Sequence, residues 1–328
     1  MKVLLLGATG LLGHNVIVEL VEQGHSVRAL VRDARRFCLP DDLQRSAMLD
    51  IVQSSNFDEQ TLLAAANGCD AIINCAAATD MSLLHYEDFR KVNVGLPKRL
   101  VEVMQRTNIS TLVQVSTANT VGIGHRGKPA NEDCEIEFPF SDSWYAQSKL
   151  ETEQMLCLAA KEHPQWHLII VNPGFMIGPF DTKPSSGELL LAAYRRRLMV
   201  VPKGGGKSFV AAVDVAAAAV NALTKGESGK RYLLTGQSLT LKEFYSLQAD
   251  CCGYKQKVLT LPRWMVLSAG AVGDVLRFLG IRTQLSLRNV RQLMVEEHYD
   301  NSRAVNVLSM PQTPLDKAIE QFFVWRQK

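Results

Sequence analysis

Short apolar runs alternate with helix-patterned segments through the first half of the chain, and this alternation constrains the fold more than any other feature. The predicted strands are Val3–Leu6, Val27–Val31, Ala47–Leu49, Ala71–Cys75, Leu112–Ser116 and Leu168–Asn172. The predicted helices are Leu11–Glu22, Glu59–Ala66, Leu83–Arg106 with a break near Gly95 and Pro97, and Ser143–Lys161. Strands that alternate with helices indicate βαβ units with right-handed crossovers. The sequence therefore predicts an α/β fold with a doubly wound parallel sheet, a Rossmann fold, whose ligand crevice lies at the carboxyl ends of the strands.

A glycine-rich turn joins the first predicted strand to the first predicted helix. Its glycines follow a GxxGxxG spacing in the segment Gly7-Ala8-Thr9-Gly10-Leu11-Leu12-Gly13. Glycines permit a tight turn and a close approach of the backbone to a pyrophosphate, and the helix N-terminus offers N–H groups to the phosphate charge. The turn therefore predicts a dinucleotide site at Gly7, Thr9, Gly10, Leu11, Leu12 and Gly13.

The pattern changes after Pro173 and Gly174. Glycine and proline become frequent, helices dominate from Val213 onward, and one apolar strand is expected at Tyr232–Leu234. We predict a dinucleotide-binding domain over residues 1–174 and a smaller, mostly helical substrate lobe over residues 175–328. The segment around 208–236 is expected to pack back on the first domain.

The end of the second predicted strand bears on the choice of cofactor. In NAD-binding folds an acidic residue near this point holds the ribose 2′-hydroxyl. Here Arg32 occupies that position, and a guanidinium favours a 2′-phosphate by charge and by its fork of donors. The sequence therefore favours NADP. NAD remains the alternative, because a shift of one residue would put Asp33 at the ribose.

Tyr145 and Lys149 form a YxxxK pair on a predicted helix. Residues four apart share one helix face, and a nearby ammonium favours the phenolate, so the pair predicts a tyrosine with a lowered pKa that exchanges a proton with an alcohol or carbonyl. Thr117, or failing it Ser116, follows a strand at the crevice and is expected to hydrogen-bond the substrate oxygen.

The chain resembles the extended short-chain dehydrogenases/reductases of the NAD-dependent epimerase/dehydratase superfamily, and within it the dihydroflavonol reductase and 3β-hydroxysteroid dehydrogenase branch. The resemblance rests on the glycine turn, Val27–Arg32, Asn74–Ala78, Asn93, Ser116–Gly122, Tyr145–Lys149, Val171–Pro179, Ser208–Ala219 and Gly229–Gly236. Thr117 matches the usual serine in the frame of the reductase branch, whereas Ala118 would match it in the sugar epimerase frame. One departure is Asn172, where the family often has an arginine.

The resemblance implies a role for each matching residue. Tyr145 would be the acid/base and Lys149 would bind the nicotinamide ribose. Further cofactor contacts would come from Asp50 and Ile51 at adenine, and from Ala76, Ala77, Ala78, Asn93, Ser116, Pro173 and Phe175. The substrate would be bordered by Thr79, Asp80, Phe175, Met176 and Phe209.

Composition excludes several other classes of function. The net charge of +3 is too small to indicate nucleic acid, and the seven histidines show no metal-ligand spacing. The seven cysteines contain no CxxC pair and are read as reduced thiols, which favours a cytoplasmic protein. No apolar stretch reaches the length of a membrane helix, so stable insertion is not expected. Trp264–Leu279, with Asp274 and Arg277, predicts an amphipathic helix on a groove or core, with peripheral membrane contact as the minority alternative.

Three hypotheses of function remain at this point. The leading one is an NADP(H)-dependent oxidoreductase, a monomer or homodimer, that interconverts a secondary alcohol and a ketone or aldehyde of a small-molecule substrate. The second is a nucleotide-sugar epimerase or dehydratase with retained NAD. The third is a non-catalytic cofactor-binding sensor, against which the intact Tyr145 and Lys149 pair argues.

Overall fold

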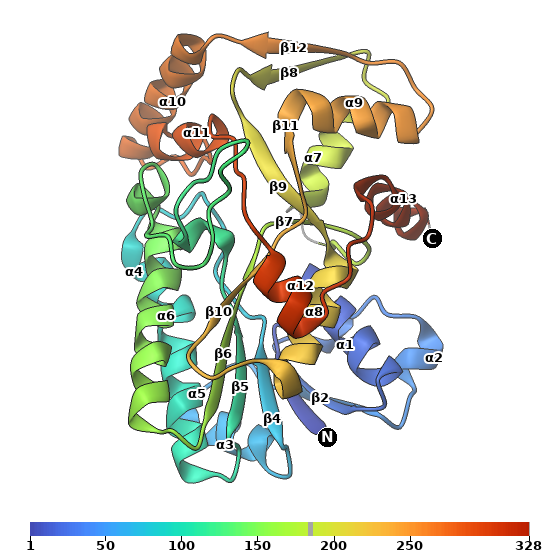
Figure 1. Cartoon of the computed structure of the whole chain (residues 1–328), viewed down its shortest axis with the longest axis vertical. Helices are drawn as coiled ribbons and strands as arrows, with labels where there is room; N and C mark the ends of the chain where they lie inside the picture. The colour runs from blue at the N-terminus through green and yellow to red at the C-terminus, as the bar shows by residue number, and fades with distance from the viewer. Residues whose placement is uncertain (183–185, 328) are drawn as a thin grey trace.

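The computed structural model describes residues 1–182 and 186–327. Its main element is a seven-stranded, wholly parallel sheet in the order β10-β6-β5-β4-β1-β2-β3 (Figure 1). The strands are β1 (Lys2–Leu6), β2 (Ser26–Val31), β3 (Leu49–Gln53), β4 (Ala71–Asn74), β5 (Thr111–Val115), β6 (His167–Pro173) and β10 (Arg231–Leu234). The predicted doubly wound α/β fold is confirmed.

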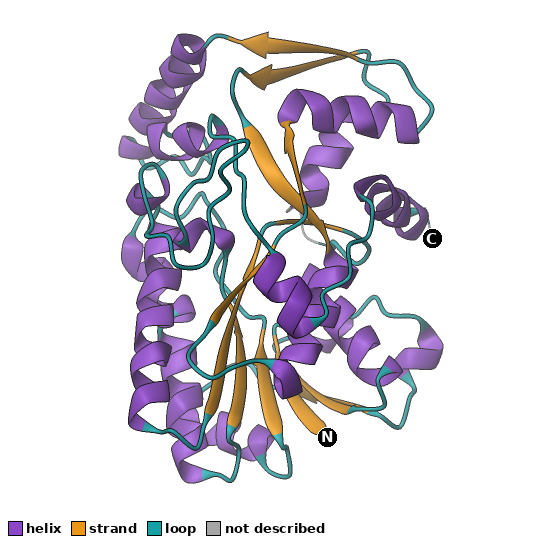
Figure 2. Ribbon diagram, in the orientation of Figure 1, coloured by secondary structure: helices purple, strands orange, loops and turns teal. Residues whose placement is uncertain are grey.

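Helices cover both faces of this sheet (Figure 2). One face carries α1 (Leu11–Glu22) and α8 (Ala212–Lys225), and the other carries α3 (Glu59–Ala66), α5 (Gly95–Arg106) and α6 (Trp144–Glu162). Strand β1 shows why its apolar run is unbroken. Val3 and Leu5 pack on the α1 side, Leu4 and Leu6 pack on the opposite side, and all four are fully buried.

Two boundaries test the strand and helix predictions. The break near Gly95 is confirmed, because α4 (Tyr86–Asn93) ends just before α5 begins. The strand predicted at Ala47–Leu49 is misplaced, because β3 runs from Leu49 to Gln53. This strand lies at the edge of the sheet, and its Asp50 and Gln53 are exposed, so it lacks the apolar run of the inner strands.

The chain crosses into the second lobe after β6 and then partly returns. Strand β10 joins the main sheet beside β6. Helix α8 packs against α1, and α12 (Ser302–Leu308) packs against α8. Residues 212–225 and 231–234 therefore belong spatially to the first domain (Figure 1).

The second lobe contains more strands than the sequence predicted. A three-stranded sheet combines β7 (Phe175–Ile177), β9 (Gly206–Ala211) and β11 (Gln237–Thr240), and a two-stranded sheet pairs β8 (Leu198–Pro202) with β12 (Lys257–Leu261). The helices of this lobe are α7 (Ser186–Ala193), α9 (Leu241–Cys251), α10 (Arg263–Phe278), α11 (Leu287–Leu293) and α13 (Leu315–Arg326). The shorter elements of the chain are α2 (Asp41–Gln44) and the 3₁₀ turns Ala34–Arg36, Ala118–Thr120 and Phe140–Asp142. Within the described residues, no helix is both long and apolar enough to cross a bilayer.

Candidate active site

The direction of strand addition reverses between β1 and β4, so the loops after these strands separate and leave a crevice at the carboxyl edge of the sheet. The glycine turn lies there. Gly7 has φ +77°, and a Cβ at this position would lie 2.5 Å from the backbone nitrogen of Ala76. A Cβ at Gly13 would lie 2.2 Å from the carbonyl oxygen of Gly7. Only glycine fits at either position, because any side chain would collide with backbone.

The N-terminus of α1 opens onto this turn without a side-chain cap. Gly10 is its N-cap residue, and the first turn carries no acidic side chain. Within the described residues, the N–H groups of Leu12 and Gly13 have no hydrogen-bond acceptor. Free N–H groups at the start of a helix attract an anion. The cradle around Gly7 and these amides therefore fit a dinucleotide pyrophosphate.

Arg32 and Asp33, on which the choice between NADP and NAD depends, have different surroundings at the end of β2. Arg32 directly follows the strand and is exposed. The Asp33 carboxylate accepts hydrogen bonds from the backbone N–H and the Nε of Arg35, at 3.1 and 2.9 Å, and these bonds hold the pKa of Asp33 below its ordinary value. The acid is thus engaged by its own turn, whereas the Arg32 guanidinium faces solvent.

The assignment of Asp50 and Ile51 to adenine does not fit the strand register. Asp50 pairs with Arg28 in the sheet, and its carboxylate lies 2.8 Å from the Arg28 Nε and 3.5 Å from the Lys2 Nζ. Ile51 pairs with Ala29. Both lie two or three residues before the end of β3 and so fall short of the carboxyl edge. This assignment is corrected: Asp50 neutralises a basic pair within the sheet.

The loop after β4 is held against the glycine turn. Asn93 on α4 fixes it: its Oδ1 accepts from the Ala78 N–H at 2.7 Å, and its Nδ2 donates to the Ala78 carbonyl at 3.1 Å and to the Ser148 Oγ at 2.9 Å. Ala76 lies against Gly7. The structure thus brings Ala76, Ala77 and Ala78 to the crevice, and the amide of Asn93 is occupied in positioning them.

Tyr145, Thr117 and Lys149 meet at the end of β5. Ser143 caps α6, and Tyr145 and Lys149 lie one turn apart near its start. The Thr117 hydroxyl lies near enough to the Tyr145 phenol to lower its pKa. The Lys149 ammonium donates to the Val115 carbonyl at 2.8 Å. The structure therefore pairs Thr117, and not Ser116, with the tyrosine.

The pKa of Tyr145 moves in the opposite direction from the prediction. Burial raises it to about 12, although the nearby Thr117 hydroxyl acts to lower it. Burial also lowers the pKa of Lys149 to about 8, with the charge of Glu153 opposing the shift. The expected lowering of the tyrosine pKa is wrong because the ammonium is directed at Val115 and desolvation of the phenol dominates. At neutral pH the tyrosine keeps its proton and the lysine is mostly charged.

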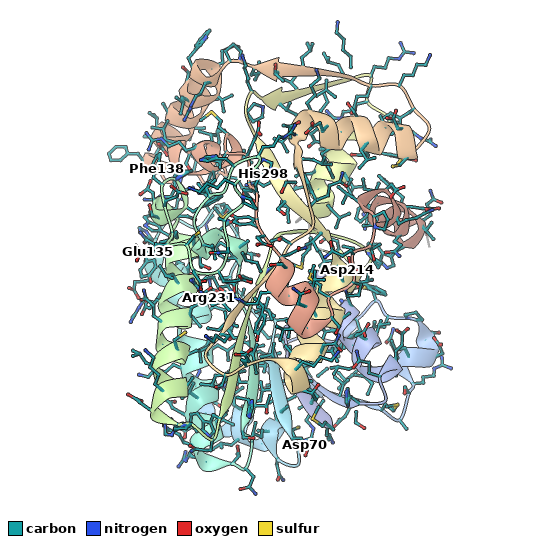
Figure 3. All side chains as sticks on the ribbon, viewed as in Figure 1. Asp70, Glu135, Phe138, Asp214, Arg231 and His298 are labelled. Atoms are coloured by element: carbon teal, nitrogen blue, oxygen red, sulfur yellow. The ribbon has the colours of Figure 1, made fainter. Side chains whose placement is uncertain are left out.

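A buried carboxylate, Glu153, lies one further turn along α6. Its Oε1 accepts from the Ser116 hydroxyl, from the Thr120 hydroxyl at 2.7 Å and from the Asn172 Nδ2 at 2.7 Å. Arg231, which Figure 3 labels, lies on β10. Its guanidinium is 3.4 Å from the Glu153 Oε2. Burial is the main cause of a raised Glu153 pKa. Ser116 therefore serves this network and does not face the substrate.

The residues expected at the substrate divide into exposed and buried ones. Thr79 and Asp80 are exposed at the crevice, and Met176 is half-buried on β7. Phe209 is only 1% exposed; its ring stacks on Phe244, with centroids 4.2 Å apart. The prediction that Phe209 borders the substrate is wrong, because this side chain belongs to the core of the second lobe.

Pro173 and Phe175 follow the end of β6. Pro173 is buried and pairs with Leu234 of β10, while Phe175 begins β7 and packs edge-on against Phe209. Gly174 between them could carry no side chain, since a Cβ there would lie 2.5 Å from the Ser208 carbonyl oxygen. This segment lies at the same edge of the sheet as the glycine turn.

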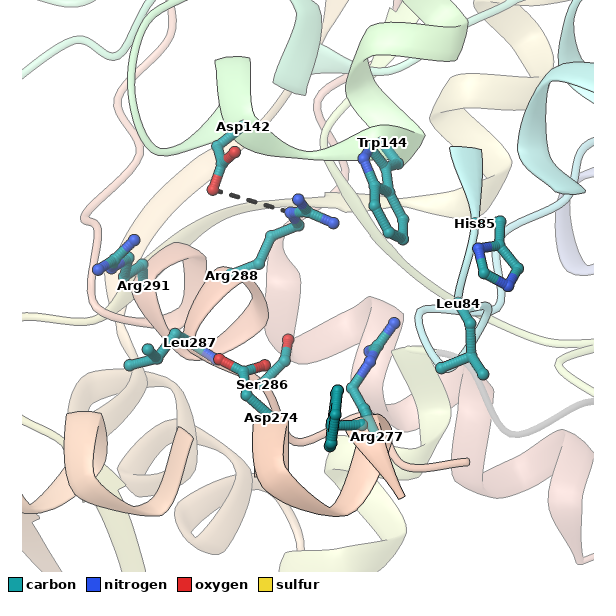
Figure 4. Close-up of a pocket in the computed structure, with 11 residues that line it drawn as sticks. Leu84, His85, Asp142, Trp144, Asp274, Arg277, Ser286, Leu287, Arg288 and Arg291 are labelled. Carbon is teal, nitrogen blue, oxygen red and sulfur yellow. Dashed lines mark hydrogen bonds and ion pairs between the residues drawn. The ribbon is translucent and has the colours of Figure 1, made fainter. Parts of the chain in front are cut away.

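A cavity of about 450 Å³ lies between α10, α11 and the start of α6 (Figure 4). Trp144, which directly precedes Tyr145, forms one wall, and the Arg288 guanidinium stacks on its ring at 3.9 Å. Arg277 on α10 donates to the carbonyl groups of Met81 and Leu83, at 3.3 and 2.6 Å. The second lobe is thus bonded to the loop that follows β4.

Sequence reasoning missed Glu153 and this cavity. The spacing of Tyr145, Lys149 and Glu153, at four and eight residues, was a usable signal for the carboxylate, because all three share one helix face. The cavity had no such signal, since its walls come from three segments that are distant in sequence.

Comparisons with known proteins show the family to which the chain belongs. The model of the NAD dependent epimerase/dehydratase family matches residues 3–234. The chain is 30% identical over 327 residues to a putative dihydroflavonol 4-reductase of Synechocystis sp., which covers 98% of this chain and 93% of the relative. It is 27% identical over 331 residues to sterol demethylase protein B of Methylococcus capsulatus, with 99% and 98% covered. The crystal structure of gox2253 superposes with a TM-score of 0.81 at 25% identity, over 99% and 98% of the two chains.

Proposed function

Because this chain belongs to the NAD dependent epimerase/dehydratase family and is an enzyme of the extended short-chain dehydrogenase/reductase type, we propose that it is an NADP(H)-dependent oxidoreductase. It interconverts a secondary alcohol and a ketone or aldehyde through Thr117, Tyr145 and Lys149. The observation that carries this proposal is the convergence of Thr117, just after β5, with Tyr145 at the start of α6, one helical turn from the buried Lys149.

The nicotinamide, when bound, supplies or accepts the hydride. Tyr145 donates its phenolic proton to the carbonyl oxygen during reduction and recovers a proton during oxidation. Thr117 donates a hydrogen bond to the same oxygen as negative charge develops there. The Lys149 ammonium, one helical turn from Tyr145, would bind the nicotinamide ribose, as the family resemblance implies. A tyrosine that is protonated at neutral pH can donate the proton that carbonyl reduction requires.

The preference for NADP rests on Arg32. Its guanidinium is exposed directly after β2, while the neighbouring Asp33 carboxylate is held by Arg35. A 2′-phosphate at this strand end gains a charged partner in Arg32, whereas a ribose hydroxyl would require Asp33 to leave its turn.

An apolar substrate fits the border of the crevice better than a sugar nucleotide. Met176 is half-buried on β7 beside the crevice, and Phe175 packs behind it. The names of two relatives, a dihydroflavonol reductase and a sterol demethylase protein, point in the same direction.

A cofactor-oxidation screen tests the proposal. Ketones, aldehydes, sterols and nucleotide sugars are offered to the purified protein with NADPH and NADH in parallel. On the substrate identified, Tyr145→Phe should lower kcat by about 10²- to 10⁴-fold. The control Tyr194→Phe, in the second lobe beside Phe323, should leave kcat unchanged.

Two outcomes would overturn the proposal. Near wild-type turnover by Tyr145→Phe would exclude the proton-transfer role of this residue. Copurified NAD(H) that survives extensive dialysis, together with activity on a nucleotide sugar alone, would identify an epimerase or dehydratase.

A further inference from the structure

The outer face of α10 is apolar and exposed. Its five most prominent side chains lie eight, three, three and one residues apart, which keeps them on one side of the helix and its end. They are between 59% and 91% exposed: Trp264, Val272, Val275, Phe278 and Leu279. Met265 adds a sixth at 40% exposure. Such a helix face normally points into a core, because water contact with apolar surface is unfavourable.

The opposite face of α10 shows why the apolar side cannot turn inward. Gly270 and Gly273 are buried there, and a Cβ at either would lie 2.6 Å from the Val290 Cγ2 or 2.1 Å from the Leu285 carbonyl oxygen. Val266 is buried on the same side. The helix thus packs on α11 and its preceding loop through small residues, and its orientation is fixed by this close contact.

The chain segment that carries this helix is strongly positive, although Arg288 within it is paired with Asp142. Between positions 255 and 295 the only acidic residue is Asp274, whereas the basic residues are Lys255, Lys257, Arg263, Arg277, Arg282, Arg288 and Arg291. The whole chain, by contrast, is nearly balanced, with 36 basic and 33 acidic residues. Lys255, Lys257, Arg263 and Arg282 are exposed, and the Asp274 carboxylate accepts from the Leu287 N–H.

We propose that the outer face of α10 docks on an anionic phospholipid bilayer, with its apolar side chains at the headgroup–acyl boundary and the surrounding cations against the lipid phosphates. An exposed apolar face with Trp and Phe, bordered by lysine and arginine, is the pattern of helices that lie in a membrane interface. The attachment is peripheral, because α10 has only 16 residues and contains Asp274 and Arg277.

The location of α10 agrees with this orientation. Figure 1 places α10 and the β8–β12 sheet at the end of the molecule away from the N-terminal strand. The exposed side chains of that sheet include Leu198, Val200 and Leu259, with Lys257 paired beside Leu198. A bilayer on α10 would also lie beside the cavity of Figure 4, whose walls include Phe278 and Trp144.

Vesicle sedimentation with the full chain tests the proposal. Extruded vesicles of phosphatidylcholine alone are compared with vesicles that contain about 30 mol% phosphatidylglycerol. The wild-type protein should partition at least about tenfold more strongly to the anionic vesicles, and this excess should fall as salt is raised to about 0.5 M. The double variant Val272→Ser/Val275→Ser should bind them about tenfold or more weakly.

The matched control is Leu158→Ser/Val324→Ser, whose two side chains are 58% and 53% exposed on α6 and α13. It should bind like the wild type. If Val272→Ser/Val275→Ser does not fold, Trp264→Ser is measured in its place. The proposal is overturned if the wild type fails to bind anionic vesicles, or if the control loses as much binding as the α10 variant. It is also overturned if light scattering detects a dimer that the α10 variant dissociates, since a second copy would then cover this face.

Discussion

Replacing Lys149 with methionine should make the folded protein more stable while removing its activity. Lys149 is 2% exposed, and its only hydrogen bond among the described residues is to the carbonyl oxygen of Val115. A buried ammonium with so little polar contact is costly. Methionine has a similar length and no charge, so it fills the same space without that cost.

The magnitude follows from the pKa of Lys149, which burial lowers from 10.5 to about 8. At pH 7 this difference corresponds to about 3 kcal/mol of destabilisation by the charged form. Methionine also removes one of the two donors to the Val115 carbonyl, since the Gln114 Nε2 remains at 2.8 Å, and the loss of this charged hydrogen bond costs about 1 to 2 kcal/mol. The free energy of unfolding of Lys149→Met should therefore exceed that of the wild type by about 1 to 2 kcal/mol at pH 7.

The dependence on pH distinguishes this explanation from a packing effect. Because the folded-state pKa lies below the unfolded value, the destabilisation by Lys149 is complete below about pH 8 and disappears as pH rises towards 10.5. At pH 9.5 its cost falls to about 1.5 kcal/mol. The advantage of the variant should shrink or vanish there, because the wild type gains stability over this interval and the variant does not.

Urea denaturation followed by tryptophan fluorescence at pH 7 and pH 9.5 measures both quantities. Lys161→Met, at an exposed position near the end of the same helix, is the control and should change stability by less than about 0.5 kcal/mol. The reasoning is refuted if Lys149→Met is less stable than the wild type at pH 7, or if the difference in stability is the same at both pH values. Activity of Lys149→Met on an identified substrate should be at least about a hundredfold lower.

Three further substitutions separate positioning, core and cofactor roles. Asn93→Ala removes the side-chain hydrogen bonds to Ala78 and Ser148 and should lower the free energy of unfolding by about 2 to 3 kcal/mol. An unchanged melting temperature would contradict the positioning role of Asn93. Phe209→Ala should lower the free energy of unfolding by about 3 to 5 kcal/mol, because it leaves a cavity beside Phe244. Thermal denaturation measures this loss. A raised KM at unchanged stability would instead show that Phe209 borders the substrate. Arg32→Ser should raise the KM for NADPH about tenfold or more and leave that for NADH unchanged, and an equal effect on both cofactors would remove the basis for NADP preference.

The inner part of the fold was predictable because burial on both faces leaves an unbroken apolar run. Val3–Leu6 is such a run, and each of its side chains packs against helices on one side of the sheet or the other. In the two-stranded sheet, β8 also contains an apolar run, Leu198–Val201, but most of this run is not buried. Its partner β12 exposes Leu259 and buries none of its side chains fully, so its sequence carries no such run.

The site was predictable where chemistry depends on spacing within one element. Helix periodicity placed Tyr145 and Lys149 on one face, and the glycine spacing identified the turn before α1. The site was not predictable for residues whose interaction partner comes from a distant part of the sequence. The acceptor for Lys149 is a backbone carbonyl, which every residue carries, and the register that removes Asp50 from the carboxyl edge depends on where β3 begins.

The contacts of Glu153 explain why position 172 is asparagine, where the family often has an arginine. The positive partner of this buried carboxylate is Arg231, which comes from the adjacent strand β10, while Asn172 on β6 donates a neutral N–H. An arginine at position 172 would add a second guanidinium to one carboxylate in a buried space, and a surplus buried charge is strongly unfavourable. The amide satisfies the same oxygen without that charge. Glu153 thereby ties the ends of β5, β6 and β10 to α6, the helix that carries Tyr145 and Lys149, so the position of the catalytic pair depends on a residue that touches neither cofactor nor substrate.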